Sequence, residues 1–200
     1  MYARSITFHG NPSGIDAGIS FVKNEVWPTL EPIDGCRGLS LLVDREVGHC
    51  IATTSWQDAE TMAASMAPTR PLRERGRDLF GATMEIDEWE IAMMHRTGHG
   101  TACRVSWMQG DMEEMSETVR MAVLPDLGDT PGFCGLSLLI NRDSGMGCAT
   151  TLWATPEAMA ASRATADQLR ERTATAASGS IMEVHEFELA FAHLHVPEMA

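Results

Sequence analysis

A chain of 200 residues can hold one or two compact cores, and 44% hydrophobic with 22% charged residues is typical of soluble globular proteins. The formal net charge of −13 repels phosphate backbones and anionic headgroups, which argues against nucleic acid and membrane partners. No apolar run has the length of a signal peptide or a transmembrane helix, so we expect a cytoplasmic protein.

The first predicted elements are a short strand and an amphipathic helix. Ser5–Phe8 is rich in β-prone residues, and residues 11–14, Asn-Pro-Ser-Gly, form a turn that can start a helix. Apolar residues then recur at helical spacing from Ile15 to Val26. Because proline lacks an N–H and its ring crowds the preceding turn, Pro28 is predicted to end this helix.

A hairpin and a second helix are predicted next. The run 39–43, Leu-Ser-Leu-Leu-Val, is almost wholly apolar, which favours a strand covered on both faces. Turn residues at 44–48 lead into a return strand that ends at Trp56, and Asp58 can cap the following helix. The half closes on a strand over 84–92.

The same elements return in the second part of the chain. Residues 35–56 reappear as 132–153, including Ala-Thr-Thr-x-Trp at the end, and a Leu-Arg-Glu-Arg block occurs at 72–75 and at 169–172. A period of about 100 residues has the size of a domain. We therefore predict two domains, 1–97 and 98–200. Pro68 and Pro71 interrupt the second helix only in the first domain, so the two pockets should differ in shape.

Each half has the order strand, helix, strand, strand, helix, strand, which is the ferredoxin-like βαββαβ order. The apolar strands of each half require cover on the face that the helices leave free. The second copy can supply that cover. The predicted fold class is therefore α+β, with two ferredoxin-like repeats packed sheet to sheet.

These motifs resemble the antibiotic biosynthesis monooxygenase (ABM) family of the dimeric α/β-barrel superfamily. The resemblance rests on the hairpin that ends in Thr-Thr-x-Trp and on the helix that opens Glu-x-Met-x-Ala-Ser, at 60–65 and 157–162. It covers nearly the whole chain as a tandem fusion. It implies an intramolecular dimeric barrel in a monomer with an internal pseudo-dimer, and a pocket between the sheet and helices of each half.

The resemblance also implies a chemistry and a set of residues. Some family members oxidise polyketide-derived aromatics with oxygen and no cofactor, and a related branch binds and degrades heme. By position, Trp56 and Trp153 would line the pockets. The heme branch resembles this chain in a polar residue after the first strand, here His9 or Asn11, but its helix histidine is missing near Met66.

The candidate site residues each have an ordinary structural alternative. The two tryptophans can stack on a flat ligand or close the core. The proposed catalytic groups can equally be solvated loop or strand residues, and the methionines can be core residues that happen to border a pocket. The predicted catalytic residues are His9, Asn11 and His185, and the predicted ligand-binding residues are Trp56, Trp153, Met62 and Met66.

No nucleophile elbow, phosphate loop or zinc-protease helix is present in the sequence. Five cysteines without metal-type spacing suggest buried thiols in a reducing compartment and no metal site. The leading hypothesis is a cofactor-independent monooxygenase for a flat hydrophobic small molecule. The alternative is a non-catalytic small-molecule or heme-binding barrel protein, so whether the chain is an enzyme at all stays open at this point.

Overall fold

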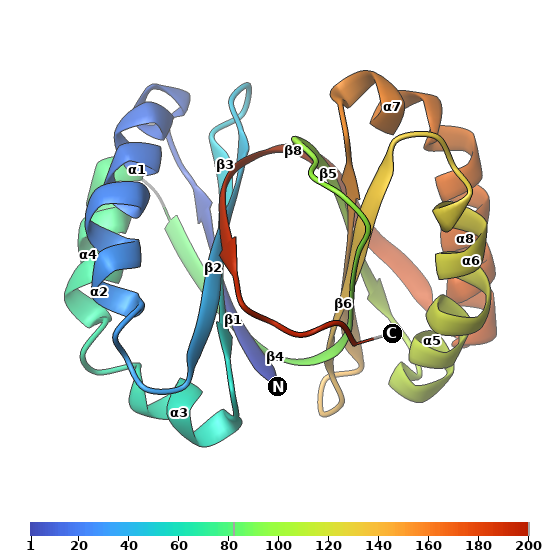
Figure 1. Cartoon of the computed structure of the whole chain (residues 1–200), viewed down its shortest axis with the longest axis horizontal. Coiled ribbons are helices and arrows are strands. Elements are labelled where there is room, and N and C mark those ends of the chain that lie inside the picture. Colours follow the sequence, from blue (N-terminus) through green and yellow to red (C-terminus); the bar gives the residue numbers. More distant parts are fainter. Residues whose placement is uncertain (82, 200) are drawn as a thin grey trace. The chain divides into compact units, whose positions relative to one another are not determined.

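The computed structural model describes residues 1–81 and 83–199. The chain divides into two compact units, one formed by Met1–Trp89 with Glu188–Val196 and the other by Glu90–Phe187 with Pro197–Ala200. In each unit, helices cover one face of an antiparallel sheet (Figure 1). This confirms the predicted α+β class.

The first repeat has four strands and two helical segments in the ferredoxin-like order. Its elements are β1 (Tyr2–His9), the 3₁₀ turn η1 (Pro12–Gly14), α1 (Ile15–Phe21), the π-helix η2 (Val22–Val26), α2 (Trp27–Leu30), β2 (Cys36–Asp44), β3 (His49–Trp56), α3 (Ala59–Ala64), α4 (Arg70–Phe80) and β4 (Thr83–Arg96).

The second repeat follows the same order. Its elements are β5 (Ala102–Gln109), α5 (Met112–Thr118), the π-helix η3 (Val119–Val123), α6 (Leu124–Gly128), β6 (Phe133–Asn141), β7 (Met146–Trp153), α7 (Pro156–Ala161), α8 (Arg163–Ala176) and β8 (Ser180–Leu194).

Strand pairing exchanges the ends of the last strands between the repeats. In the first unit β3 pairs with β1 and β2, and residues 38–43 of β2 pair with residues 188–194 of β8. In the second unit β7 pairs with β5 and β6, and residues 135–140 of β6 pair with residues 90–96 of β4. The strand order is therefore β1-β3-β2-β8 in the first unit and β5-β7-β6-β4 in the second. The boundary between domains 1–97 and 98–200 stays a prediction about the sequence repeat.

The prediction that proline ends the first helix of each repeat is wrong. The chain remains helical past Pro28 to Leu30, and past Pro125 to Gly128. A π-helical turn precedes each proline, and its wider hydrogen bonding, with the Trp27 amide donating to the Val22 carbonyl, accommodates a residue that an α-helix would exclude.

The second helical segment differs between the repeats, as Pro68 suggested. The prediction that Pro71 interrupts it is wrong, because Pro71 lies in the first turn of α4, where a missing N–H breaks no helical hydrogen bond. In the first repeat α3 and α4 are separated by a turn over residues 65–69, whereas in the second repeat only Ser162 separates α7 from α8. Because α4 and α8 each pack over the sheet of their own unit, this difference changes the helical layer that faces each sheet.

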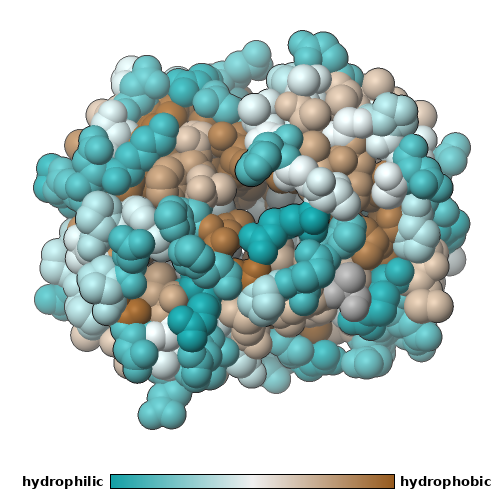
Figure 2. Space-filling model, in the orientation of Figure 1, coloured by the Kyte–Doolittle hydropathy of each residue, from teal (hydrophilic) through white to brown (hydrophobic). Residues whose placement is uncertain are grey.

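The surface is largely polar on the face shown in Figure 2, where hydrophilic residues surround smaller apolar areas. Within the described residues, no helix has the length and apolar character needed to cross a membrane.

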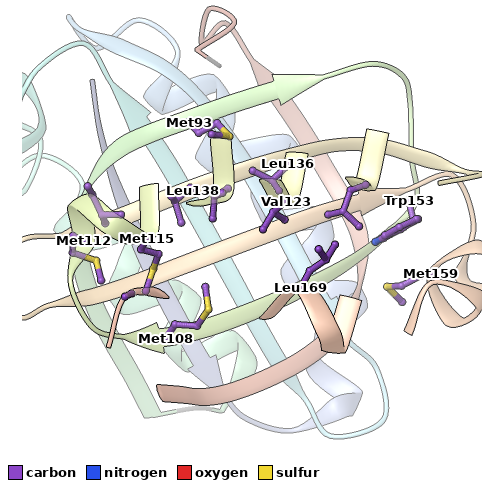
Figure 3. Close-up of a cluster of buried hydrophobic side chains, with 14 of the residues drawn as sticks. Met93, Met108, Met112, Met115, Val123, Leu136, Leu138, Trp153, Met159 and Leu169 are labelled. Atoms are coloured by element: carbon purple, nitrogen blue, oxygen red, sulfur yellow. The ribbon is translucent and has the colours of Figure 1, made fainter. Parts of the chain in front are cut away.

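Each unit has its own hydrophobic core between sheet and helices. Figure 3 shows the core of the second unit, where Met115 and Val123 point toward Leu136, Leu138 and the sheet. In the first unit, Leu39 and Leu41 are fully buried on one face of β2, and Leu42 is 7% exposed on the other. The prediction of a strand buried on both faces is therefore confirmed.

Close packing in the first unit predicts that Gly18→Ala destabilises the fold. A Cβ at Gly18 would lie 2.1 Å from Cζ of Phe80, whose ring packs against Phe8 with the centroids 5.1 Å apart. We expect a loss of about 1–3 kcal/mol of unfolding free energy, measured by urea denaturation.

Gly128→Ala in α6 is the control, because a Cβ there meets no atom within 4 Å. This variant should be neutral or gain up to about 1 kcal/mol from helix propensity. A Gly18→Ala protein as stable as the control would contradict the packing described for Phe80.

Candidate functional site

A cavity of about 60 Å³ lies between the sheet and the helices of the first unit. Strands β1, β2 and β3 form one wall, and the helical segments α1, η2, α2 and α4 form the other. The wall is mostly aliphatic and aromatic, with Phe8, Phe21 and Phe80 among its residues. Its polar members are Arg4, Thr54, Thr69 and Arg73.

Trp56 lines this cavity, as the family resemblance implied. The side chain is only 1% exposed, and its indole Nε1 donates a hydrogen bond to Thr54 Oγ1 at 2.9 Å. Because this N–H already has an acceptor, Trp56 offers a ligand the carbon surface of its ring. It also belongs to the hydrophobic core of the first unit, so its core role is observed and its role in ligand binding stays a prediction.

Arg4 on β1 joins three elements at the edge of the cavity. Its guanidinium donates to Glu88 Oε1 through Nε and Nη2 at 2.9 and 2.7 Å, to Ser65 Oγ at 2.8 Å and to the Met62 carbonyl at 2.7 Å. Arg4 is 2% exposed. A buried guanidinium with a carboxylate and two neutral acceptors fixes β1, α3 and β4 against one another.

Arg73 on α4 places a second guanidinium on the cavity wall. It donates to Thr69 Oγ1 at 2.5 Å and to the Met66 carbonyl at 2.7 Å, and the residue is 9% exposed. Burial, and then the positive charge of Arg4, lower the pKa of Arg73 below its usual value. Arginine nonetheless keeps its proton in proteins, so the wall carries two positive charges.

The second unit has a smaller cavity, of about 40 Å³, at the equivalent place. Met108 and Thr173 line it where Phe8 and Gly76 line the first, and Ala177 occupies the position of Phe80. Trp153 is fully buried and its Nε1 donates to Thr151 Oγ1 at 3.0 Å, but Trp153 is not among the residues that line this cavity. The two sites therefore differ in size and in aromatic content.

His9 and Asn11 lie at the end of β1 and do not line either described cavity. The exposed ring of His9 stacks on His49 with the centroids 4.3 Å apart. Asn11 caps the turn η1, where its Oδ1 accepts hydrogen bonds from the backbone N–H and hydroxyl of Ser13. The structure therefore gives Asn11 a capping role.

His185 lies on β8 in the second unit and is also absent from the cavity walls. Its Nε2 is 3.3 Å from Glu183 Oε2, and its ring meets Trp107 edge-on at 5.9 Å. This contact with Glu183 lies at a partly exposed strand position.

The predicted methionines contribute mainly through their backbones. The Met62 side chain is 4% exposed and belongs to the hydrophobic core, while the Met62 and Met66 carbonyls hold Arg4 and Arg73. Neither arginine is among the residues that the sequence predicts for the site. The signal that could identify Arg73 is the recurrence of the Leu-Arg-Glu-Arg block at the same place in both copies.

The cysteines fit the prediction of buried thiols, with four buried and Cys36 half-buried. Burial raises the pKa of Cys50 and of Cys103 to about 12, which keeps both thiols protonated at neutral pH. In the part of the chain that the structure describes, no group of three or more His, Cys, Asp or Glu residues is placed to hold a metal ion.

The fold is that of ABM-like proteins. Solved structures with this fold include an anthrone oxidase-like protein (TM-score 0.68, 11% identity, 100% of this chain and 94% of that chain). A monooxygenase-like protein from Listeria innocua (TM-score 0.55, 11% identity, 94% of each chain) and a heme-degrading enzyme from Listeria monocytogenes (TM-score 0.54, 9% identity, 94% and 99%) are further examples. At these identities the likeness concerns the fold, and it confirms the predicted tandem of two ABM-like repeats.

By sequence, the chain belongs to the family of the uncharacterized proteins Rv2557 and Rv2558 of Mycobacterium tuberculosis (strain H37Rv). It is 39% identical to each over its full length, and the matches cover 92% and 87% of those proteins. No family model matches the chain.

The second unit repeats the buried arginine cluster and predicts a pH-dependent contribution from Glu186. Burial by itself would raise the pKa of Glu186, but hydrogen bonds from Arg104 and Arg163 lower it below its usual value. A lowered folded-state pKa stabilises the protein above the unfolded-state pKa, and this stability is lost as the pH falls through the folded-state value.

Glu186→Gln should therefore lose about 1–3 kcal/mol of unfolding free energy at pH 7, and the difference from wild type should shrink below about pH 4. Urea denaturation at a series of pH values measures this. Glu117→Gln, at an exposed position of α5, is the control and should change little. A Glu186→Gln effect that is the same at pH 3 and pH 7 would contradict the assignment.

Proposed function

We propose that the first unit binds a small, flat hydrophobic molecule in the cavity lined by Trp56. The observation that carries the proposal is an apolar cavity with four aromatic side chains and two buried guanidinium groups. Ligand pockets typically combine such an apolar wall with a few fixed polar groups. The second cavity is smaller and lacks the phenylalanines, so the first unit is the binding unit in this proposal.

The volume limits the ligand. An apolar cavity of about 150 Å³ is large enough for benzene, so a cavity of about 60 Å³ admits at most a single ring, and only if its side chains move apart. A larger polyketide-like ligand would extend out of the cavity or displace side chains of α4. The proposal includes a protein that needs no cofactor, acts as a monomer and resides in the cytoplasm.

Cofactor-independent oxygenation is the second candidate function, because buried guanidinium groups stabilise the enolate or carbanion that such chemistry requires. In this reaction a substrate CH₂ group becomes a carbonyl with one atom of O₂, and the other atom leaves as water with the two hydrogens. No carboxylate or imidazole lies on the described wall of the cavity. Deprotonation there would depend on Arg4 and Arg73 lowering the pKa of the substrate itself. A catalytic role for His9 or His185 remains a prediction.

Heme is a weaker candidate for this cavity. None of the described residues on its wall offers an imidazole, thiolate, thioether or phenolate as an iron ligand. A hemin titration that gives a stoichiometric Soret shift would favour heme over the small-molecule proposal.

The proposal predicts that Gly76→Leu blocks binding. A Cβ at Gly76 would lie 3.4 Å from Cζ of Phe8, so the first carbon fits and a longer side chain fills the cavity. We expect benzamide, a neutral single-ring probe, to bind the wild type and to lose about tenfold or more in affinity in Gly76→Leu, measured by calorimetry.

Gly76→Ala is the matched control and should bind benzamide almost as well as the wild type. Urea midpoints should show that both variants are folded. Wild-type affinity in a folded Gly76→Leu protein would place the ligand elsewhere and overturn the proposal. For the oxygenase candidate, quinol-type aromatics should cause oxygen uptake that Gly76→Leu abolishes, and no uptake with the wild type would exclude it for those substrates.

A further inference from the structure

The two units differ in how they neutralise an arginine at the same position, which is buried in the first unit and half-buried in the second. Arg73 in α4 and Arg170 in α8 occupy equivalent positions of the repeated Leu-Arg-Glu-Arg block, and each lines the cavity of its own unit. In the second unit Arg170 forms an ion pair with Asp167, three residues earlier on the same helix. The second cavity is therefore electrically balanced by the chain itself.

The first unit lacks this internal partner. The position equivalent to Asp167 is Arg70, which pairs with the exposed Glu74 at 3.7 Å. Arg73 donates only to two neutral oxygens, and no described carboxylate forms an ion pair with it. Glu88 engages Arg4, the other guanidinium on the wall. The groups at the first cavity thus leave one positive charge without a carboxylate.

A guanidinium that is nine-tenths buried and makes no ion pair is costly even with the exposed Glu74 next to it in the chain, and proteins normally pair such a charge with an anion. Here the charge borders an aromatic cavity in a chain whose formal net charge is −13. A chain with this negative net charge does not attract anions in general, so the positive charge at the cavity is a local feature of this site. A planar carboxylate is the natural complement of a guanidinium, and an apolar ring would fill the rest of the cavity.

We propose that the first unit is specific for a hydrophobic anion, an aromatic carboxylate or an equivalent enolate, with Arg73 as its counter-ion, and that the second unit is not. This inference rests on the proposed small-molecule function and names the class of ligand. In this inference Arg73 binds the anionic group of the ligand. In the second unit Asp167 takes the place of that group, because it already supplies a carboxylate to Arg170.

The test compares benzoate with benzamide, which has the same shape and no charge. Wild-type protein should bind one benzoate per chain about tenfold or more tightly than benzamide, measured by calorimetry at pH 7. Arg73→Met should abolish this preference, so that benzoate binds no more tightly than benzamide.

Arg70→Asp provides a second variant that leaves Arg73 in place. It creates the same three-residue spacing as Asp167 and Arg170, so the new carboxylate should neutralise Arg73 and weaken benzoate about tenfold. Arg170→Met is the matched control, and its preference for benzoate should equal that of the wild type. Urea midpoints verify the folding of all three variants.

The outcomes separate this inference from the function on which it rests. If Arg73→Met and Arg70→Asp keep the wild-type preference for benzoate while Gly76→Leu removes all binding, the cavity is the site and the anion inference fails. If Arg170→Met instead loses the preference, the anion binds the second unit, which also overturns the inference. If the wild type binds neither probe, both the proposed function and the inference fail.

Discussion

The buried guanidinium of Arg4, with its counterpart Arg104, is the interaction around which each unit is organised. Arg4 links β1 to the last turn of α3 and to β4, and Arg104 makes the same bonds to Ser162, the Met159 carbonyl and Glu186. Removing one partner of a buried ion pair typically costs about 3–5 kcal/mol. Because Arg4 also lines the first cavity, its bonds hold part of the cavity wall in place.

On this shared framework, a few side chains make the two cavities different. Phenylalanines at positions 8 and 80 give the first cavity aromatic walls, and Gly76 leaves room that Thr173 takes in the second. Arg70 stands where the second repeat has Asp167. This difference changes the charge balance at the cavity without changing the fold. A duplicated domain can preserve its core in both copies and keep a binding function in one, since the bonds that define the fold do not involve these positions.

Much of the fold could be predicted because periodicity and the repeat constrain it strongly. The strand over 39–43, the capped helix after Asp58 and the βαββαβ order all follow from local pattern. The end of the first helix could not be predicted in this way. Pro28 normally stops an α-helix, and only the π-helical turn over Val22–Val26, which packs into the core, allows the chain to continue.

The sequence by itself determined the duplication, the class of fold and the place of Trp56 at the end of the hairpin, because these depend on local spacing along one chain. Only the tertiary structure decided which residues share a cavity. His9 and Asn11 lie close to the hairpin but do not line the cavity. Arg73, a helix residue in a charged block, does line it. Whether a buried charge has a partner depends on neighbours distant in sequence, so the charge balance at Arg73 and Arg170 became visible only once the chain was folded.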